Sequence, residues 1–239
     1  MKVLNDIVGK HLKIYQDDDF FKFSLESVLL PDFVTINLRD KMILDLCSGN
    51  CPIPLILSKK TNAHIYGVEL QKEVYELGRE SIIINNKEDQ ITLLNEDVLN
   101  LKNVFKGDMF DIITVNPPYF KDYEKSIKNK NQIKAIARHE NNLNLESLFK
   151  IVNYLLKTNA SFYMVHRTER LIEIISLLNK YNLIPKSIEF IYPSRGMESK
   201  LFMIKAVKGG HEGVKIHDGL YIHKKDGSYR DEIKKIFGE

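Results

Sequence analysis

The sequence predicts an α/β fold: a mostly parallel β-sheet with an antiparallel edge strand and helices on both faces. Short apolar segments alternate with longer helical patterns between residues 41 and 207, as in a doubly wound sheet. The first apolar segments are hydrophobic throughout, which is typical of parallel strands that helices cover on both faces. The last two, 187–191 and 201–207, flank a turn-rich stretch and are therefore expected to pair antiparallel.

The predicted elements begin in a lead-in, residues 1–40, with a short strand at 12–15. A helix follows that Ser24 caps and that ends at Pro31, because proline has no N–H to continue the hydrogen-bond ladder. The alternating elements of the main domain, residues 41–207, come next. They are strand 42–44, helix 53–59, strand 65–68, helix 72–85, strands 91–94 and 110–115, helix 145–156, strand 161–165, helix 167–181 and the final strand pair.

Residues 208–239 form a predicted C-terminal tail. Gly209 and Gly210 break the chain, and Asp226-Gly227 predicts a turn. A short terminal helix is expected after Ser228, which would cap it with Asp231 at the third helical position. The 239 residues therefore suit one α/β domain with modest additions at both ends.

The composition is that of an ordinary globular protein, with 44% hydrophobic and 28% charged residues. No apolar run is long enough to span a bilayer, and residues 1–6 lack the apolar core of a signal peptide, so we expect a cytoplasmic protein without a membrane partner. The only cysteines, Cys47 and Cys51, cannot by themselves supply the four ligands of a structural zinc. We expect two reduced thiols and no metal.

A turn-forming segment follows the first predicted strand of the main domain and opens a helix. A turn there presents backbone N–H groups, and a small residue such as Gly49 lets a ligand approach the backbone. Only one of the three glycines of a dinucleotide-binding loop is present, and there is no lysine-bearing phosphate loop. The segment is Asp45-Leu46-Cys47-Ser48-Gly49-Asn50-Cys51-Pro52.

Two further acids follow the next two predicted strands. Glu69 lies 24 residues after Asp45, where a carboxylate can accept hydrogen bonds from two ribose hydroxyls. Asp97 follows the third strand and can accept from an adenine amine. Each acid alone is more often a cap or turn residue, but acids at three successive strand ends favour a ligand with a ribose, an adenine and no pyrophosphate.

Asn116-Pro117-Pro118-Tyr119 follows the strongly apolar fourth strand. The segment could be a strand-ending turn. At this position, however, Asn116 Oδ1 and the Pro117 carbonyl can each accept an N–H from an amine whose lone pair is delocalised, and Tyr119 offers a ring on which a base can stack. Catalysis by positioning needs neither a metal nor a strong base.

Together these motifs resemble the Rossmann-like S-adenosylmethionine-dependent amino-methyltransferases over residues 40–207. The resemblance implies S-adenosyl-L-methionine as the cofactor, and Cys47 and Cys51 stand where that class usually has glycines. It implies catalytic roles for Asn116, Pro117 and Tyr119. The implied cofactor-binding residues are Phe23, Ser24, Glu26, Asp45, Cys47, Gly49, Glu69, Leu70, Asp97, Val98 and Asn116.

The lead-in, from Gln16 through Phe21-Lys22-Phe23-Ser24-Leu25 to Leu30, resembles the bacterial tRNA adenine-N6 methyltransferases that modify the adenine 3′ of the anticodon in a valine tRNA. That resemblance implies methyl transfer to an adenine N6 amine, with the anticodon-loop region of a tRNA as the partner. In that family an aspartate is commoner at the position of Glu26. The implied substrate-binding residues are Pro118, Tyr119, Phe120, Lys125, Lys128, Lys130, Arg138, His139 and Arg195.

The residues proposed for RNA contact also have simpler interpretations. Residues 121–138 contain six basic and two acidic side chains, so the segment carries +4 against +3 for the whole chain. This excess suits a phosphate-bearing partner, with 121–140 as an RNA-contacting loop, although a solvated lysine-rich loop has the same charge. His139 suits a phosphate or structural contact better than a catalytic base. Phe120 also suits a core position, and Arg195 an ordinary surface position.

Two other functions stay open from the residues. A protein glutamine-N5 methyltransferase acting on a release factor shares the Asn-Pro-Pro-Tyr motif, but that family usually has a longer helical domain before the first motif. Here 44 residues precede Asp45. A non-catalytic RNA-binding relative is the other alternative, which the intact set of residues 116–119 disfavours and Cys51 keeps open.

Overall fold

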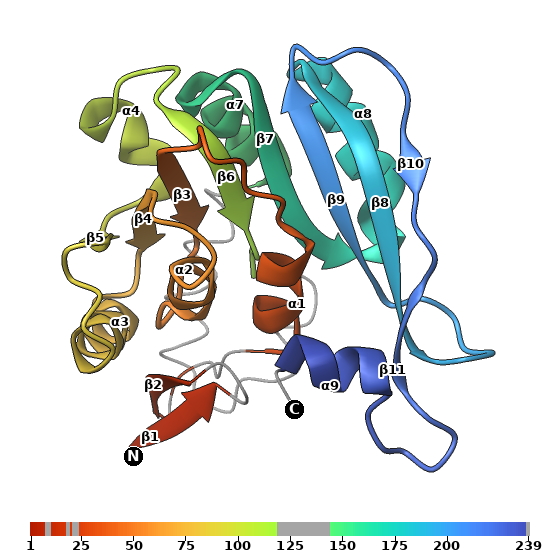
Figure 1. The fold of residues 1–239 in the computed structure, drawn as a ribbon. Helices are drawn as coiled ribbons and strands as arrows, with labels where there is room; N and C mark the ends of the chain where they lie inside the picture. The colour runs from red at the N-terminus through yellow and green to blue at the C-terminus, as the bar shows by residue number, and fades with distance from the viewer. Residues whose placement is uncertain (8–10, 18–19, 21–23, 119–143, 238–239) are drawn as a thin grey trace, which may run out of the picture.

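The computed structural model describes residues 1–7, 11–17, 20, 24–118 and 144–237, and it forms a large twisted sheet with helices on both faces (Figure 1). A separate hairpin, β1 (Lys2–Ile7) with β2 (Leu12–Asp17), lies at the N-terminus. Its first strand was not expected, because its residues 2–6 are exposed and show no apolar alternation.

The large sheet has the order β10-β8-β9-β7-β6-β3-β4-β5, and β11 also pairs with β8. Strand β9 runs antiparallel to both of its neighbours, and all the other pairs are parallel. The predicted fold class, including the antiparallel pairing of the last two strands of the main domain, is confirmed. The strands are β3 (Met42–Leu46), β4 (His64–Glu69), β5 (Ile91–Asn95), β6 (Phe110–Val115), β7 (Leu156–Arg167), β8 (Leu183–Ser194), β9 (Leu201–Lys208), β10 (Lys215–Ile216) and β11 (Leu220–His223).

The helices divide between the two faces and bury a hydrophobic core on each. Residues of α1, α2, α3 and α9 belong to one core cluster, and residues of α4, α7 and α8 to the other. The α-helices are α1 (Glu26–Phe33), α2 (Pro52–Leu57), α3 (Lys72–Ile84), α4 (Leu101–Val104), α7 (Leu145–Leu155), α8 (Leu171–Lys180) and α9 (Asp231–Phe237), and the 3-10 turns are η1 (Val98–Asn100) and η2 (Thr168–Arg170).

Helix α1 does not end where the sequence suggests. It continues past Pro31 to Phe33, and Val34 N–H closes its last turn on the Leu30 carbonyl at 3.1 Å. Lys60 Nζ donates to the carbonyl oxygens of Pro31 at 2.7 Å and Val34 at 2.9 Å, which supplies partners that a helix end otherwise lacks. The prediction that Pro31 ends the helix was therefore wrong. The local sequence could not show that Lys60, from a distant segment, bonds the carbonyl oxygens at this helix end.

The predicted cap of helix α1 was also wrong. The residue before the helix is Leu25, and no side chain caps it. Ser24 contributes its backbone carbonyl, which accepts from Ser27 N–H at 3.1 Å. The first turn is held instead by burial of the apolar residues that follow it.

The C-terminal segment joins the same sheet. Strands β10 and β11 add to β8 in parallel. Helix α9 contacts α1, and its residue Ile233 is fully buried in the core. The predicted turn at Asp226-Gly227 is confirmed, with Gly227 at a φ of +83°. The predicted Ser228 cap is wrong, because the Ser228 hydroxyl donates to Asp226 Oδ1 at 2.7 Å and the helix begins only at Asp231.

Within the described ranges, no helix is both long and apolar enough to cross a membrane. The same residues contain no group of three or more histidine, cysteine, aspartate or glutamate side chains placed to hold a metal ion.

Candidate active site

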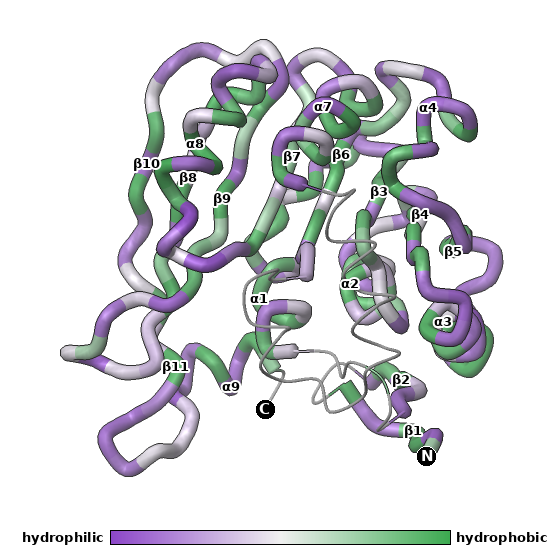
Figure 2. Tube along the Cα trace, turned by 180° about the vertical axis from the view of Figure 1, so that it is seen from behind, coloured by the Kyte–Doolittle hydropathy of each residue, from purple (hydrophilic) through white to green (hydrophobic). Residues whose placement is uncertain are grey.

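The candidate site lies where the parallel strands β3, β4, β5 and β6 end. These strands are neighbours in the sheet, so the segments that follow them meet at one edge. Helix α1 lies beside the ends of β6 and α2 in both views (Figures 1 and 2). The predicted acids and Asn116 all come from these strand ends, as the sequence suggested.

The loop after β3 has a left-handed backbone at three positions: Cys47 (φ +58°), Gly49 (φ +56°) and Cys51 (φ +75°). Left-handed geometry favours glycine and costs other residues roughly 1–2 kcal/mol each. This geometry is a physical reason why glycines are usual at the positions of Cys47 and Cys51. Ser48 ties the loop to β4, since its N–H donates to the Val68 carbonyl at 2.9 Å and its Oγ accepts from Val68 N–H at 3.1 Å. Apart from its two chain neighbours, no described residue has an atom within 4 Å of the place where a Gly49 Cβ would stand, so the described part of the structure leaves this face of the loop open.

Both thiols are free. Burial raises the pKa of each thiol, and the nearby carboxylates of Asp45 and Glu69 raise it further, so both groups are protonated at neutral pH. Protonated thiols are small, neutral groups and poor nucleophiles. The prediction of two reduced cysteines agrees with this arrangement.

Glu69 ends β4 and is only 7% exposed. Its Oε2 accepts from Gly49 N–H and its Oε1 from Gln71 N–H, both at 2.9 Å. Burial raises the pKa of this carboxyl, whereas the backbone hydrogen bonds lower it. Each oxygen has a second lone pair, so the carboxylate can shape the loop and still accept from a ligand.

Asp45, within β3, is fully buried. Its Oδ1 accepts from Thr114 Oγ1 on β6 at 2.6 Å, while Oδ2 has no hydrogen-bond partner among the residues that the structure describes. Burial raises the pKa of Asp45 to about 7. An unpaired buried carboxylate oxygen is costly, and a cationic or N–H-bearing ligand would satisfy it.

The raised pKa of Asp45 should make the free energy of unfolding depend on pH. Because Asp45 titrates near 7 when folded and at 3.8 ordinarily, the folded state disfavours its charge, and the penalty grows as pH rises through that window. Relative to wild type, Asp45→Asn should therefore gain roughly 2–3 kcal/mol of unfolding free energy between pH 5 and pH 8. Urea denaturation of both proteins at the two pH values measures it.

A fixed cost of burying the new amide in Asp45→Asn cancels from that comparison. Burial lowers the pKa of His166 to about 4, below this range, from its ordinary 6.5, within it. His166 therefore also makes stability depend on pH here, but it is present in both proteins. Parallel pH dependences of the two proteins would show that Asp45 is ionised in the folded state throughout.

Asp97 caps the 3-10 turn η1, with its side chain accepting from Leu99 N–H at 2.8 Å. Val98 behind it is buried. Asn95 Nδ2 donates to the backbone carbonyls of Glu69 and Leu70, both at 2.9 Å, and so joins the ends of β4 and β5. The cap is the simpler of the two interpretations of Asp97, and its adenine contact stays a prediction.

Asn116 follows β6 directly. Since Leu46 pairs with Val115, Asn116 lies beside Cys47, at the start of the loop. Its Nδ2 donates to Ser27 Oγ on α1 at 3.1 Å. Pro117 is buried, and Pro118 is partly exposed. The amide of Asn116 is thus anchored at the edge of the sheet next to the predicted cofactor loop.

The remaining predicted site residues differ in how far the structure describes them. Ser24 and Glu26 lie at the start of α1, next to Ser27 in sequence. Arg195 lies after β8 on the same edge of the sheet. Strands β9 and β7 separate β8 from β6, so the ends of β8 and β6 are on the order of 14 Å apart. Phe23, Tyr119, Phe120, Lys125, Lys128, Lys130, Arg138 and His139 lie outside the described residues.

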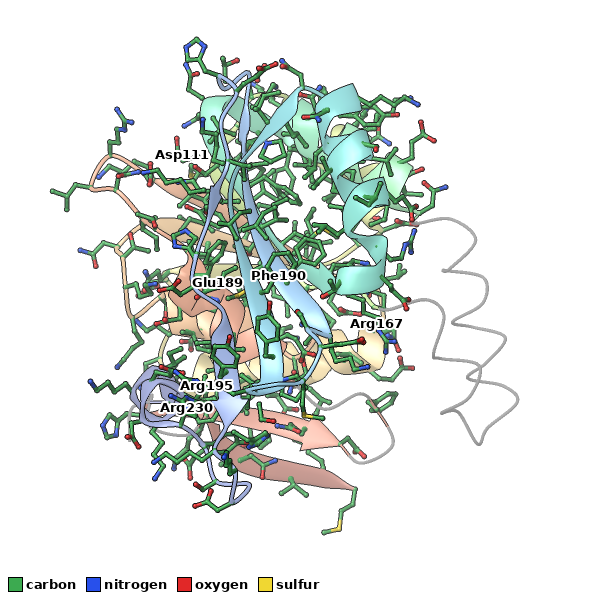
Figure 3. The ribbon with its side chains drawn as sticks, turned by 90° about the vertical axis from the view of Figure 1, so that its right-hand side faces the viewer. Asp111, Arg167, Glu189, Phe190, Arg195 and Arg230 are labelled. Carbon is green, nitrogen blue, oxygen red and sulfur yellow. The ribbon has the colours of Figure 1, made fainter. Side chains whose placement is uncertain are left out.

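Arg195 instead belongs to an aromatic cluster at the end of β8 (Figure 3). Its guanidinium is 5.6 Å from the centroid of the Tyr221 ring, which stacks on Tyr192 at 5.0 Å. The side chain is exposed, as an ordinary surface arginine or an RNA contact would be.

The sequence motifs assigned no role to three polar residues of the site. Ser27, Ser48 and Thr114 are all buried, and each bonds to a residue that the motifs did identify or to its neighbour. No local pattern distinguishes them from other serines and threonines, because each also has a partner distant in sequence: Asn116 for Ser27, Asp45 for Thr114 and Val68 for Ser48.

The fold is shared with solved methyltransferases. A predicted O-methyltransferase from Agrobacterium tumefaciens superposes with a TM-score of 0.69 at 16% identity, covering 88% of this chain and 94% of that one. A geranyl diphosphate methyltransferase in complex with SAM superposes at 0.56 and 10% identity, over 77% of this chain and 84% of that one. The chain therefore has the methyltransferase fold that the sequence predicted.

Sequence comparison defines the family. The protein-family model described as N-6 DNA Methylase matches residues 35–166, more than half of the chain, so the protein belongs to this family. A relative from Bacteroides thetaiotaomicron is 27% identical over 73% of this chain and 71% of its own length, and is named tRNA1(Val) (adenine(37)-N6)-methyltransferase. The predicted resemblance to tRNA adenine-N6 methyltransferases is confirmed.

Proposed function

We propose that this protein transfers a methyl group from S-adenosylmethionine to the exocyclic N6 amine of an adenine in a tRNA. The observation that carries the proposal is the placement of Asn116: its amide is fixed by α1 at the strand edge and lies beside the Asp45–Cys51 loop. The family and the named relatives agree with adenine as the target base and tRNA as the substrate.

The residues after β3, β4 and β5 fit the cofactor. The open face of Gly49 leaves room for a ligand against the backbone, and the unpaired Oδ2 of Asp45 calls for a donor or a cation. Glu69 has lone pairs left for two hydroxyls, and Asp97 stands one strand further for an adenine amine. When bound, S-adenosylmethionine would supply a ribose, an adenine, an ammonium group that can donate to a carboxylate, and an electrophilic methyl group on a sulfonium.

The chain's own contribution to the chemistry is positioning. Asn116 Oδ1 and the Pro117 carbonyl accept the two N–H bonds of the adenine amine and draw the nitrogen out of conjugation with the ring. The lone pair then points along the line of transfer. The nitrogen becomes cationic in the transition state, and the two oxygens stabilise that charge more than they stabilise the neutral amine.

No catalytic base is required at the start of this reaction, because the neutral amine attacks with both of its N–H bonds intact. The methylated nitrogen then loses one proton to water. Tyr119 would stack on the target base, and Pro118 would line its approach. The finer assignment, an adenine in the anticodon-loop region, follows the name of the relative, which specifies adenine 37 of tRNA1(Val).

The test is direct. Purified protein is incubated with methyl-labelled cofactor and total tRNA, and the digested RNA is analysed by nucleoside mass spectrometry. We expect N6-methyladenosine in a tRNA fraction. Label on protein glutamine would favour the release-factor methyltransferase, and tRNA binding without any transfer would favour a non-catalytic relative.

Binding of tRNA should depend on the basic segment. Replacing Lys125, Lys128 and Lys130 with alanine removes three positive charges from the +4 segment. If each contacts a phosphate, the slope of log K against log salt should become less steep by roughly two to three. Filter binding at several salt concentrations measures it, with Lys59, Lys72 and Lys106 replaced together as a charge-matched control. An unchanged slope would indicate that the segment is only solvated.

A further inference from the structure

The contact between helix α1 and Asn116 links two residues 89 positions apart. Ser27 is only 6% exposed, and its Oγ is the acceptor for Asn116 Nδ2 at 3.1 Å. A side-chain amide has its acceptor oxygen and its donor nitrogen on opposite arms of one plane. A partner that occupies the nitrogen therefore also decides which way the oxygen faces.

We propose that Ser27 is a positioning residue for Asn116: by accepting from Nδ2, it presents Oδ1 to the target amine. This inference rests on the proposed function. Without the hydroxyl, Nδ2 loses this acceptor. An amide turned the other way would offer N–H donors to the amine, which would repel rather than hold the substrate's own N–H groups. Ser27 itself touches neither cofactor nor base in this scheme.

The position of the hydroxyl is set by the packing of α1. Val28, Leu29 and Leu30, which follow Ser27, are buried in the core. Lys60 holds the carbonyl end of the helix, and the terminal helix α9 packs against it. A serine on a helix that is fixed from three sides can hold an amide more rigidly than one on a loop.

The alternative is that Ser27 only fills space. Three variants separate the two roles. Ser27→Ala removes the hydroxyl, and Ser27→Thr retains it. Ser58→Ala removes a hydroxyl of similar burial just after α2, where it donates to the Leu55 carbonyl at 2.8 Å. Single-turnover methylation of tRNA and calorimetric cofactor affinity are measured for each.

We expect Ser27→Ala to lower the single-turnover rate roughly 10-fold, the effect of one hydrogen bond used in orientation, with cofactor and tRNA affinities within about twofold of wild type. Ser27→Thr should recover most of the rate, and Ser58→Ala should be unaffected. In an Asn116→Ala background the Ser27→Ala change should cost nothing further, because its target is gone.

A normal rate for Ser27→Ala would overturn the inference. So would a loss of rate that matches a loss of cofactor affinity, an equal loss in Ser27→Thr, or an additive loss in the double variant. Failure of the proposed function itself is distinguishable, because wild-type protein would then yield no methylated adenosine in the same assay.

Discussion

Asn116→Ala should reduce turnover on tRNA roughly 100-fold while leaving cofactor affinity within about twofold of wild type. The substitution removes one of the two oxygens that hold the amine, and each ~1.36 kcal/mol of lost transition-state stabilisation is a factor of ten in rate. The side chain also donates to Ser27, so its loss frees the α1 contact. Single-turnover kinetics with saturating tRNA, together with calorimetry for the cofactor, measure both quantities.

The matched variant is Asn116→Asp, which keeps an acceptor oxygen of the same reach but has no Nδ2 to donate. It should retain more activity than the alanine variant. If Asn116→Ala turns over as fast as wild type, Asn116 has no role in holding the amine. If rate and cofactor affinity fall together, the side chain serves the cofactor site instead.

Glu69→Ala should weaken cofactor binding by a factor of roughly 10 to 100, since hydrogen bonds to a charged group contribute about 1.5–3 kcal/mol each. Two losses combine here. The ribose loses its acceptor, and the loop loses the carboxylate that receives Gly49 and Gln71 N–H at 2.9 Å. Isothermal calorimetry with S-adenosylmethionine provides the measurement.

Glu69→Gln separates these two losses. It keeps one oxygen as an acceptor but converts the other to a donor, which cannot receive a backbone N–H. We expect an affinity between those of wild type and the alanine variant. Equal affinity in all three proteins would remove Glu69 from the cofactor site, and circular dichroism would show whether either variant had lost its fold.

Much of the site could be predicted because its residues directly follow strands. The periodicity of apolar residues identifies the strands, and parallel strands with helical crossovers end at a common edge. Asp45, Glu69 and Asn116 therefore had to come near one another whatever the details of packing. The structure confirms that proximity, and the roles of these residues stay predictions.

The sequence pattern was wrong in two places where a hydrogen bond forms that the pattern did not include. Pro31 does not end α1, because Lys60 takes up carbonyl oxygens at the helix end. Ser228 does not cap α9, because Asp226 takes its hydroxyl. In both cases the local rule is sound, but a competing hydrogen bond decides the outcome.

The sequence by itself determined most of the strands and helices of residues 41–207, the edge at which the acids and Asn116 meet, and the class of ligand that those residues suit. Only the tertiary structure decided that Ser27 faces Asn116, that Thr114 holds one oxygen of Asp45, and that the C-terminal segment extends the sheet beyond β8. The physical reason is that these contacts join residues far apart in the sequence. Periodicity reports which face of a segment is buried, whereas these contacts depend on which distant segment does the burying.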